Sequence, residues 1–276
     1  MHIVSLINMK GGVGKTTLSV NICDCLARRH NQRVLLVDID PQFNATQCLL
    51  SGSEYEKHLK EQKDTILSVF ERDARTFVST TEGPGQTKSK KLKDIDPIKV
   101  KENYYLLPGN LELYRIEMAS GDGRENRLNK FLKELEAENK FDFVIIDTPP
   151  TPSIWMTSAL LASQYYLIPV KPDPISFTGI DLLESIINYK KENLDLDISC
   201  IGIVLTVVED WTLVYKEAVK FLQQGRWAGY KYKKDLPKRT AVAKNQLNKV
   251  FILDLPDNQV KTALSGIVDE LLQRIQ

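Results

Sequence analysis

Met9-Lys10-Gly11-Gly12-Val13-Gly14-Lys15-Thr16-Thr17 lies between an apolar run and a stretch with helical character. Residues 3–7 predict a buried strand, and residues 18–29 predict a helix. A glycine-rich turn between a strand and a helix is the setting of a phosphate-binding loop. The glycines let successive backbone N–H groups point into one hollow, and the helix adds its positive N-terminal end. An incidental lysine in a glycine turn is the alternative, which the Gly-Lys-Thr spacing disfavours.

The residue types of this loop predict a nucleotide with its metal ion. Lys15 can reach the β- and γ-phosphates of ATP, and the Thr16 hydroxyl can bind Mg²⁺. We therefore expect ATP and Mg²⁺ as cofactors. The expected nucleotide contacts in the loop are Lys10, Gly11, Gly12, Val13, Gly14, Lys15, Thr16 and Thr17.

Acidic residues follow two further apolar runs. Residues 33–37 run into Asp38 and Asp40, and residues 143–146 run into Asp147. Fully apolar strands that alternate with helices predict a parallel sheet covered on both faces, whose functional groups sit at the carboxyl ends of the strands. Asp147 would hold a metal-bound water, because Mg²⁺ prefers oxygen ligands. A turn-forming aspartate that merely ends its strand is an equally good interpretation of Asp38.

These motifs together resemble the ParA/MinD family of ATPases with a deviant Walker A loop. Met9 replaces the first glycine of the standard loop, and Lys10 stands beside it. The resemblance implies that Lys10 crosses a dimer interface to the partner's phosphates, and that Asp40 positions the attacking water. Residues 37–46 resemble the family's switch I and residues 147–150 its switch II. Local sequence alone would also allow Lys10 to be an ordinary surface charge.

The resemblance implies a catalytic set of Lys10, Lys15 and Asp40 and a metal set of Thr16, Asp40 and Asp147. Residues 235–239 resemble the family's Ile-Pro-Arg segment, which implies nucleotide contacts at Pro237 and Lys238. Phe43 departs from the family, in which many members carry glycine there. That substitution puts the geometry of the loop in question, but it leaves the chemistry intact.

Length and composition limit the classes of protein. The chain has 276 residues and a formal net charge of +1. We expect one α/β domain over residues 1–276, with a doubly wound, mostly parallel sheet flanked by helices and a variable, partly mobile region at about 51–103. Cys23, Cys25, Cys48 and Cys200 form no C-x-x-C pair and are expected to be reduced. No apolar run approaches the ~20 residues of a membrane helix.

The two ends of the chain carry further expectations. Because the chain enters a strand at once, we expect no signal peptide and no preceding helix-turn-helix domain, and a cytoplasmic, nucleoid-associated protein. A MinD protein ends in a basic amphipathic membrane helix. The expected C-terminal helix, at about 258–275, carries Asp269 and Glu270 and few basic residues, so we expect it to pack in the core.

Positive charge is concentrated between residues 211 and 250, although the whole chain is nearly neutral. Such an excess predicts a site for a polyanion, with a solvated lysine-rich face as the alternative. No groove-reading motif is present, so we expect sequence-independent contact with phosphates. The expected DNA-binding residues are Lys216, Lys220, Lys233, Lys234, Lys238 and Arg239.

The sequence thus favours a Mg-ATP-dependent DNA partition ATPase. The resemblance implies an ATP sandwich homodimer, slow hydrolysis, nonspecific DNA binding and stimulation by a ParB-like partner. A MinD-like or other cargo-positioning ATPase that does not act through DNA is the alternative. An iron–sulfur reductase on the same fold would need cluster cysteines between the switch regions, and no cysteine lies between Cys48 and Cys200.

Overall fold

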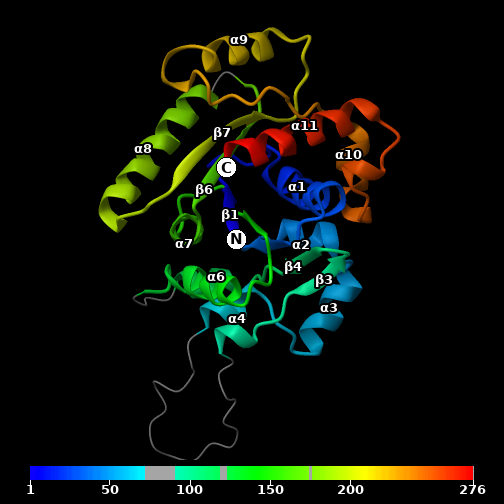
Figure 1. The fold of residues 1–276 in the computed structure, drawn as a ribbon, viewed down its shortest axis with the longest axis vertical. Helices are drawn as coiled ribbons and strands as arrows, with labels where there is room; N and C mark the ends of the chain where they lie inside the picture. The colour runs from blue at the N-terminus through cyan, green and yellow to red at the C-terminus, as the bar shows by residue number, and fades with distance from the viewer. Residues whose placement is uncertain (72–90, 119–122, 174–175, 276) are drawn as a thin grey trace, which may run out of the picture.

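A seven-stranded sheet forms the centre of the molecule in the computed structural model, which describes residues 1–71, 91–118, 123–173 and 176–275 (Figure 1). The strand order is β3-β4-β2-β5-β1-β6-β7, and only β3 runs antiparallel to its neighbour. The expected single α/β domain with a doubly wound, mostly parallel sheet is confirmed. The strands are β1 (His2–Leu6), β2 (Val34–Asp38), β3 (Ile98–Lys101), β4 (Tyr104–Leu107), β5 (Phe143–Asp147), β6 (Tyr165–Val170) and β7 (Ser199–Leu205).

Alternating side chains of the central strands fill the cores on both faces of the sheet. On β1, Val4 and Leu6 pack into one core, and Ile3 packs into the other. Both faces of β2 and β5 are buried in the same way, which is why these strands appear as continuous apolar runs in the sequence. One core lies against α1 (Lys15–His30), α2 (Asn44–Leu49) and α11 (Asn258–Arg274).

The opposite face of the sheet carries two cores. One involves α4 (Ile66–Phe70), α5 (Leu113–Met118) and α6 (Arg127–Ala137). The other involves α8 (Ser176–Leu194) and α9 (Leu213–Leu222), and α7 (Ile154–Ala162) contributes to both. The remaining helical elements are α3 (Gly52–Lys60), α10 (Thr240–Asn245) and the short 3-10 helices η2 (Leu92–Asp94), η3 (Gly225–Trp227), η4 (Gln246–Asn248) and η5 (Ile252–Asp254).

The C-terminal helix packs in the core, as its polar face predicted. Val260, Leu264, Ile267 and Leu271 of α11 are fully buried in the core that α11 shares with α1. In the part of the chain that the structure describes, no helix is long and apolar enough to cross a membrane.

The region at about 51–103, expected to be variable and partly mobile, contains regular structure in its described residues. Ser51 begins α3 with a capping box, in which its hydroxyl accepts from the Glu54 N–H while the Glu54 carboxylate accepts from the Ser51 N–H. Further along, β3 adds an antiparallel edge strand to β4. Residues 72–90 of this region lie outside the described residues, and η2 begins at Leu92.

Candidate functional site

The phosphate-binding loop lies between β1 and α1, as expected. Gly12 and Gly14 adopt left-handed backbone conformations with φ of 69° and 77°, which glycine adopts readily. The Thr206 hydroxyl, just after β7, donates to the Val13 carbonyl at 2.5 Å and so ties the loop to the sheet. The loop forms one wall of a hollow of about 380 Å³, lined by all of Gly11 to Thr17. This volume and the curled backbone fit a nucleotide's phosphates.

Lys15 lies buried at the base of this hollow. Its ammonium group donates to the carbonyls of Asn8 at 2.9 Å and Lys10 at 3.2 Å, so the side chain folds back along its own loop. Burial lowers the pKa of Lys15, and the nearby carboxylates of Asp147 and Asp40 oppose that shift. An anion in the hollow would add further countercharge to this partly desolvated ammonium.

Asp147 ends β5 beside the loop and anchors two hydroxyls of α1. Its carboxylate accepts from Thr16 at 2.7 Å and from Ser19 at 2.8 Å. Burial raises the pKa of Asp147 to about 6, although both hydrogen bonds lower it. A buried carboxylate next to the loop's threonine is a donor set that suits Mg²⁺, which would also relieve the desolvation of the charge. Ser19 is a member of this cluster that sequence reasoning missed.

Asp38 and Asp40, two residues apart, have different surroundings. Asp38 is fully buried, and one of its oxygens accepts from the Thr46 N–H at 2.8 Å and from the Thr46 hydroxyl at 2.7 Å. Burial and the neighbouring Asp147 hold the pKa of Asp38 well above its ordinary value. Asp38 thus fixes the start of α2, whereas Asp40 lines the hollow. Burial also raises the pKa of Asp40, and the charge of Lys15 opposes the shift.

Lys10 does not enter the hollow of its own chain. Its ammonium group forms an ion pair with Asp173 at 2.6 Å, and its backbone N–H donates to the Asn8 side chain at 2.9 Å. Both charged side chains of the pair are about one third exposed. Asp173 follows β6, so the pair joins the loop to the next strand of the sheet.

The opposite wall of the hollow comes from residues that the sequence did not reveal. Gln246 of η4 accepts from the Thr17 hydroxyl at 2.9 Å and donates to the Cys48 sulfur at 3.1 Å. Leu247 also lines the hollow, and 65% of its surface is exposed. Burial raises the pKa of Cys48 to about 12, so its thiol is inert at neutral pH. No local motif marks Gln246, because only the tertiary fold brings it to the loop.

Pro237 and Lys238 lie outside the residues that line this hollow. Pro237 forms an isolated β-bridge with Val208, the residue after Val207, which lines the hollow. Pro237 itself lines a neighbouring pocket. The Lys238 ammonium reaches Glu209 at 3.3 Å. The structure therefore brings this segment next to the nucleotide hollow but does not bring it into contact with the phosphate loop.

The basic segment at 211–250 divides into paired and unpaired cations. Arg226, Lys231, Lys238, Arg239 and Lys249 each form ion pairs with carboxylates. Arg239 binds Asp257, the residue that caps α11. Within the described residues, Lys216, Lys220, Lys233 and Lys234 form no ion pair, and all four are exposed. Two of the six expected DNA contacts, Lys238 and Arg239, are thus already engaged within the chain.

Comparison with known proteins agrees with this geometry. The AAA domain family model matches residues 1–199. The chain is 31% identical over 245 residues to the sporulation initiation inhibitor protein Soj of Bacillus subtilis (strain 168), covering 88% of this chain and 84% of Soj.

Two solved structures show the same fold. One is a putative plasmid partition protein from Borrelia burgdorferi B31 bound to AMPPNP, with a TM-score of 0.77, 22% identity and 99% of each chain covered. The other is cobyrinic acid a,c-diamide synthase from Mycobacterium smegmatis with an ATP analogue and magnesium, with a TM-score of 0.75 and 24% identity, covering 100% of this chain and 96% of that one. With its deviant phosphate loop and its match to Soj, the chain belongs to the ParA/MinD family of P-loop ATPases.

Proposed function

We propose that this chain is a DNA partition ATPase that binds Mg·ATP, forms an ATP-dependent sandwich homodimer and binds DNA without sequence preference. Hydrolysis is slow and is stimulated by a ParB-like partner, and the protein acts in the cytoplasm on the nucleoid. The observation that carries the proposal is the pair of lysines at the phosphate loop: Lys15 lies inside the hollow, whereas Lys10 points away from it to Asp173.

The proposed roles of the site residues rest on their surroundings and on the resemblance to the family. Lys15 and the N–H groups of the loop bind the phosphates, Thr16 and Asp147 hold Mg²⁺, and Asp40 orients the attacking water. Bound Mg²⁺ neutralises charge on the phosphates. Lys10 supplies a second cation across the dimer interface. This chemistry consists of positioning and charge neutralisation, with no covalent intermediate.

The proposed DNA surface centres on the unpaired cations Lys216, Lys220, Lys233 and Lys234. The first two lie one helical turn apart on α9, and the other two lie in the segment that follows η3. Tyr215 of α9 and the exposed Trp211 just before this helix line the same pocket as Lys233 and Lys234, so α9 and this segment border one surface. A surface with so few cations binds DNA weakly, and two copies in an ATP dimer would bind more tightly through avidity.

A gel-shift series across salt, run with ATP and with ADP, tests the proposal. Binding should appear with ATP only and weaken steeply as salt rises, because DNA binding releases counterions. Lys216→Glu combined with Lys233→Glu should abolish the shift and preserve ATP-dependent dimerisation measured by light scattering. Lys130→Glu combined with Lys133→Glu is the matched control, since it reverses two exposed charges on α6.

The outcomes separate the functions. Equal DNA binding with ATP and with ADP would break the link between the dimer and DNA. An ATP dimer that binds no DNA would favour a positioner of another cargo, the alternative that the sequence leaves open. Lys15→Ala should abolish nucleotide binding, and Asp40→Ala should slow hydrolysis while the ATP dimer persists.

A further inference from the structure

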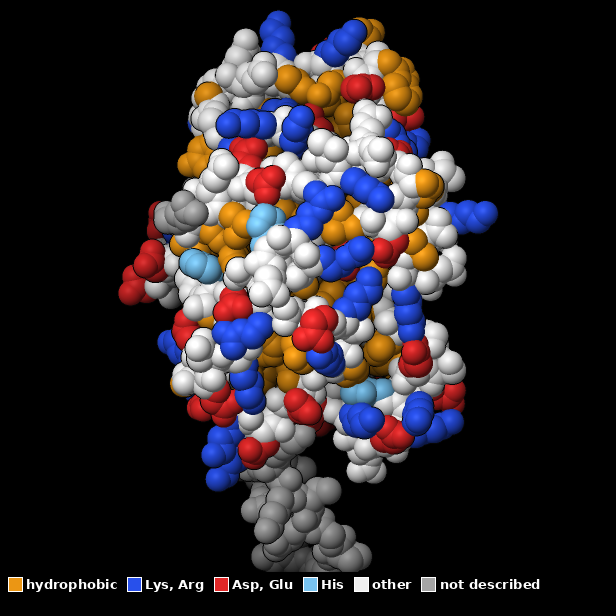
Figure 2. Space-filling view, turned by 45° about the vertical axis from the view of Figure 1, so that its right-hand side comes forward, with side chains coloured by type: hydrophobic (Ala, Val, Ile, Leu, Met, Phe, Trp, Pro, Cys, Tyr) orange, Lys and Arg blue, Asp and Glu red, His pale blue; other side chains and the backbone are white. Residues whose placement is uncertain are grey.

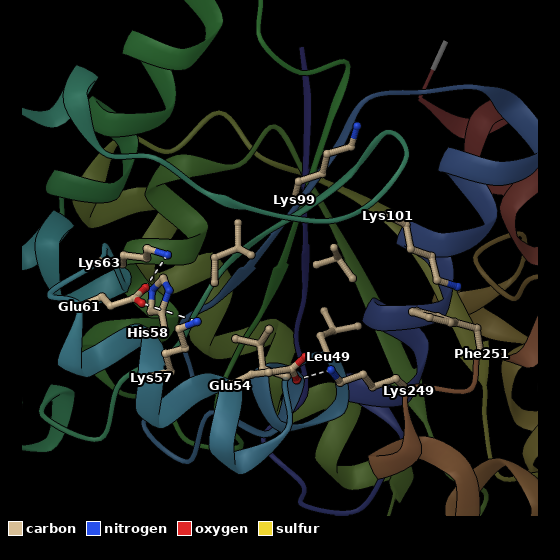
Figure 3. A pocket seen from close by; sticks show the side chains of 13 residues that line it. Leu49, Glu54, Lys57, His58, Glu61, Lys63, Lys99, Lys101, Lys249 and Phe251 are labelled. Atoms are coloured by element: carbon tan, nitrogen blue, oxygen red, sulfur yellow. Dashed lines mark hydrogen bonds and ion pairs between the residues drawn. The ribbon is translucent and has the colours of Figure 1, made fainter.

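A second hollow of about 370 Å³ lies next to the nucleotide site, between α3, β3 and the segment after η4 (Figure 3). Its floor is apolar and includes Leu49, Val100 and Phe251. Its rim carries the lysines Lys57, Lys63, Lys99, Lys101 and Lys249. We call this hollow the β3 groove. On the face that Figure 2 presents, Lys and Arg side chains surround patches of apolar surface.

The β3 groove runs along the edge of the sheet. It is lined by four consecutive residues, Ile98 to Lys101, and an irregularity in the pairing with β4 between Lys99 and Lys101 interrupts the regular alternation of their side chains. The hollow thus lies beside β3, the outermost strand of the sheet. The outer edge of β3 pairs with no other strand of the described residues, since β3 ends the sheet and pairs only with β4. Unpaired edges of this kind accept an added strand.

Charge selects what can bind at this edge. The residues that line the groove include five lysines and two glutamates, Glu54 and Glu61. All five lysines form ion pairs within the chain, so an acidic ligand would exchange with these carboxylates: Lys57 and Lys63 pair with Glu61, Lys99 with Glu102, Lys101 with Asp24 and Asp254, and Lys249 with Glu54. Lysines on an edge strand discourage pairing with a second copy of the same strand, because like charges would meet. The same lysines favour a strand that carries carboxylates. Among the described residues, the Lys99 side chain forms an ion pair with the exposed Glu102 alone, at 2.8 Å, so it can exchange that partner at little cost.

We propose that the β3 groove binds an extended acidic segment of a partner protein, which adds to β3 as a further strand and places alternate apolar side chains on the floor. Carboxylates of the segment would pair with the lysine rim, while its backbone would pair with β3. The apolar floor and the strand edge favour a peptide over a nucleic acid, whose phosphates need cations but no ladder of backbone hydrogen bonds.

Binding of a labelled synthetic peptide tests this proposal. The probe is a capped peptide of about eight residues, alternating glutamate and valine, followed by fluorescence polarisation. It should bind, whereas the same peptide with lysine in place of glutamate should not. A version with N-methylated backbone on the pairing edge should bind at least about tenfold more weakly, because it cannot donate ladder hydrogen bonds.

Protein variants locate the site. Lys57→Glu combined with Lys99→Glu should weaken peptide binding about tenfold or more. Both side chains are exposed, and their ion pairs are with exposed glutamates, so the fold is preserved. Lys130→Glu combined with Lys133→Glu makes the same change in charge on α6 and should have no effect.

Hydrogen exchange supplies a readout that charge alone would not change. Bound peptide should slow the exchange of amide protons in Ile98–Lys101, because an added strand accepts from them. Absence of peptide binding, or binding that neither Lys57→Glu with Lys99→Glu nor N-methylation weakens, would overturn the proposal. A DNA duplex that displaces the peptide and protects the same amides would identify the groove as a polyanion site instead. The proposed DNA surface on α9 shares no residue with the groove, so the two proposals fail independently.

Discussion

Lys10 is the residue whose surroundings most restrict the proposed dimer. In the single chain its ammonium group is held by Asp173 at 2.6 Å, so it must leave this partner to reach another subunit's phosphates. A partly exposed ion pair of this kind is worth about 0.5–1 kcal/mol. Asp173→Asn should therefore strengthen ATP-dependent dimerisation about fivefold to thirtyfold over the two copies, as measured by light scattering with a slowly hydrolysed ATP analogue.

A double-mutant cycle shows whether the effect passes through Lys10. Lys10→Ala should leave the monomer's affinity for ATP largely intact and should remove the ATP dimer. Asp173→Asn should then have no effect on dimerisation in the Lys10→Ala background. If Lys10→Ala dimerises as well as the parent, the proposed role of Lys10 across the interface is wrong.

Asp147 makes the stability of the nucleotide-free protein depend on pH. Burial raises its pKa from an ordinary value of 3.8 to about 6, so the folded state binds this proton more tightly than the unfolded state does. The stabilisation from protonated Asp147 is complete below the pKa that this carboxyl has in the unfolded chain, and it is lost as pH rises through about 6. Urea unfolding without nucleotide or Mg²⁺ should therefore show a free energy of unfolding that falls between pH 4 and 6.

Asp147→Asn should remove part of this fall in the free energy of unfolding with rising pH. At pH 7 it should stabilise the nucleotide-free protein by about 1–2 kcal/mol, less than the pKa shift alone suggests, because an amide cannot accept from both hydroxyls. Asp142→Asn is the control with the opposite sign. The hydrogen bond from Arg33 lowers the pKa of Asp142, so its contribution is lost as pH falls. If Asp147→Asn leaves the pH dependence of the free energy of unfolding unchanged, Asp147 is not its cause.

At the scale of elements, the start of α2 depends on a strained residue. Phe43 has φ 43° and ψ 40°, a left-handed conformation that costs a non-glycine residue about 1–2 kcal/mol. Its ring stacks on Tyr55 of α3 at a centroid distance of 5.2 Å, and this contact helps to hold the strained turn. Phe43→Gly and Phe43→Ala both remove the ring, but only glycine relieves the backbone. Phe43→Gly should therefore be more stable than Phe43→Ala by about 1 kcal/mol in urea unfolding.

Gly109 shows how tightly this turn is packed. A Cβ at Gly109 would lie 2.6 Å from the Cβ of Phe43 and 3.0 Å from the carboxylate carbon of Asp38. Gly109→Ala should thus destabilise the protein more than either change at Phe43.

For the comparison at Phe43, equal stability of Phe43→Gly and Phe43→Ala would mean that the backbone strain at this residue is not significant.

The elements that could be predicted from sequence are those buried on both faces. The runs in β1, β2 and β5 are continuous because each strand has apolar neighbours above and below, and β2 and β5 end in Asp38 and Asp147. By contrast, β3 is only four residues long and lies at an edge, and α3 has few apolar residues. Neither has a strong hydrophobic period. Gln246 could not be predicted, because its contact with Thr17 depends on how η4 packs against α1.

At the scale of the whole molecule, the nucleotide hollow and the β3 groove share two walls. In α2, Cys48 lines the hollow and Leu49 lines the groove. In the segment from η4, Gln246 lines the hollow and Lys249 lines the groove, where it pairs with Glu54 of α3. Gln246 also joins the loop to α2 by bonding both Thr17 and Cys48. A ligand in the nucleotide hollow and a ligand in the β3 groove would therefore both contact α2 and the segment from η4.

This shared wall predicts that Mg·ATP and an acidic peptide in the β3 groove affect each other's binding. If a nonhydrolysable ATP analogue with Mg²⁺ changes the peptide's dissociation constant by some factor, the peptide must change the analogue's constant by the same factor, because coupling free energy is reciprocal. We expect a factor of about five or more. Gln246→Ala should bring that factor close to one while each ligand still binds alone, because it removes the link between Thr17 and Cys48 but none of the groove's lysines. Fluorescence polarisation with the peptide and titration calorimetry with the analogue measure the two factors separately. A peptide constant that is the same with and without the analogue would show that the two sites are independent despite their common walls, and coupling that survives Gln246→Ala would assign the link to α2 alone.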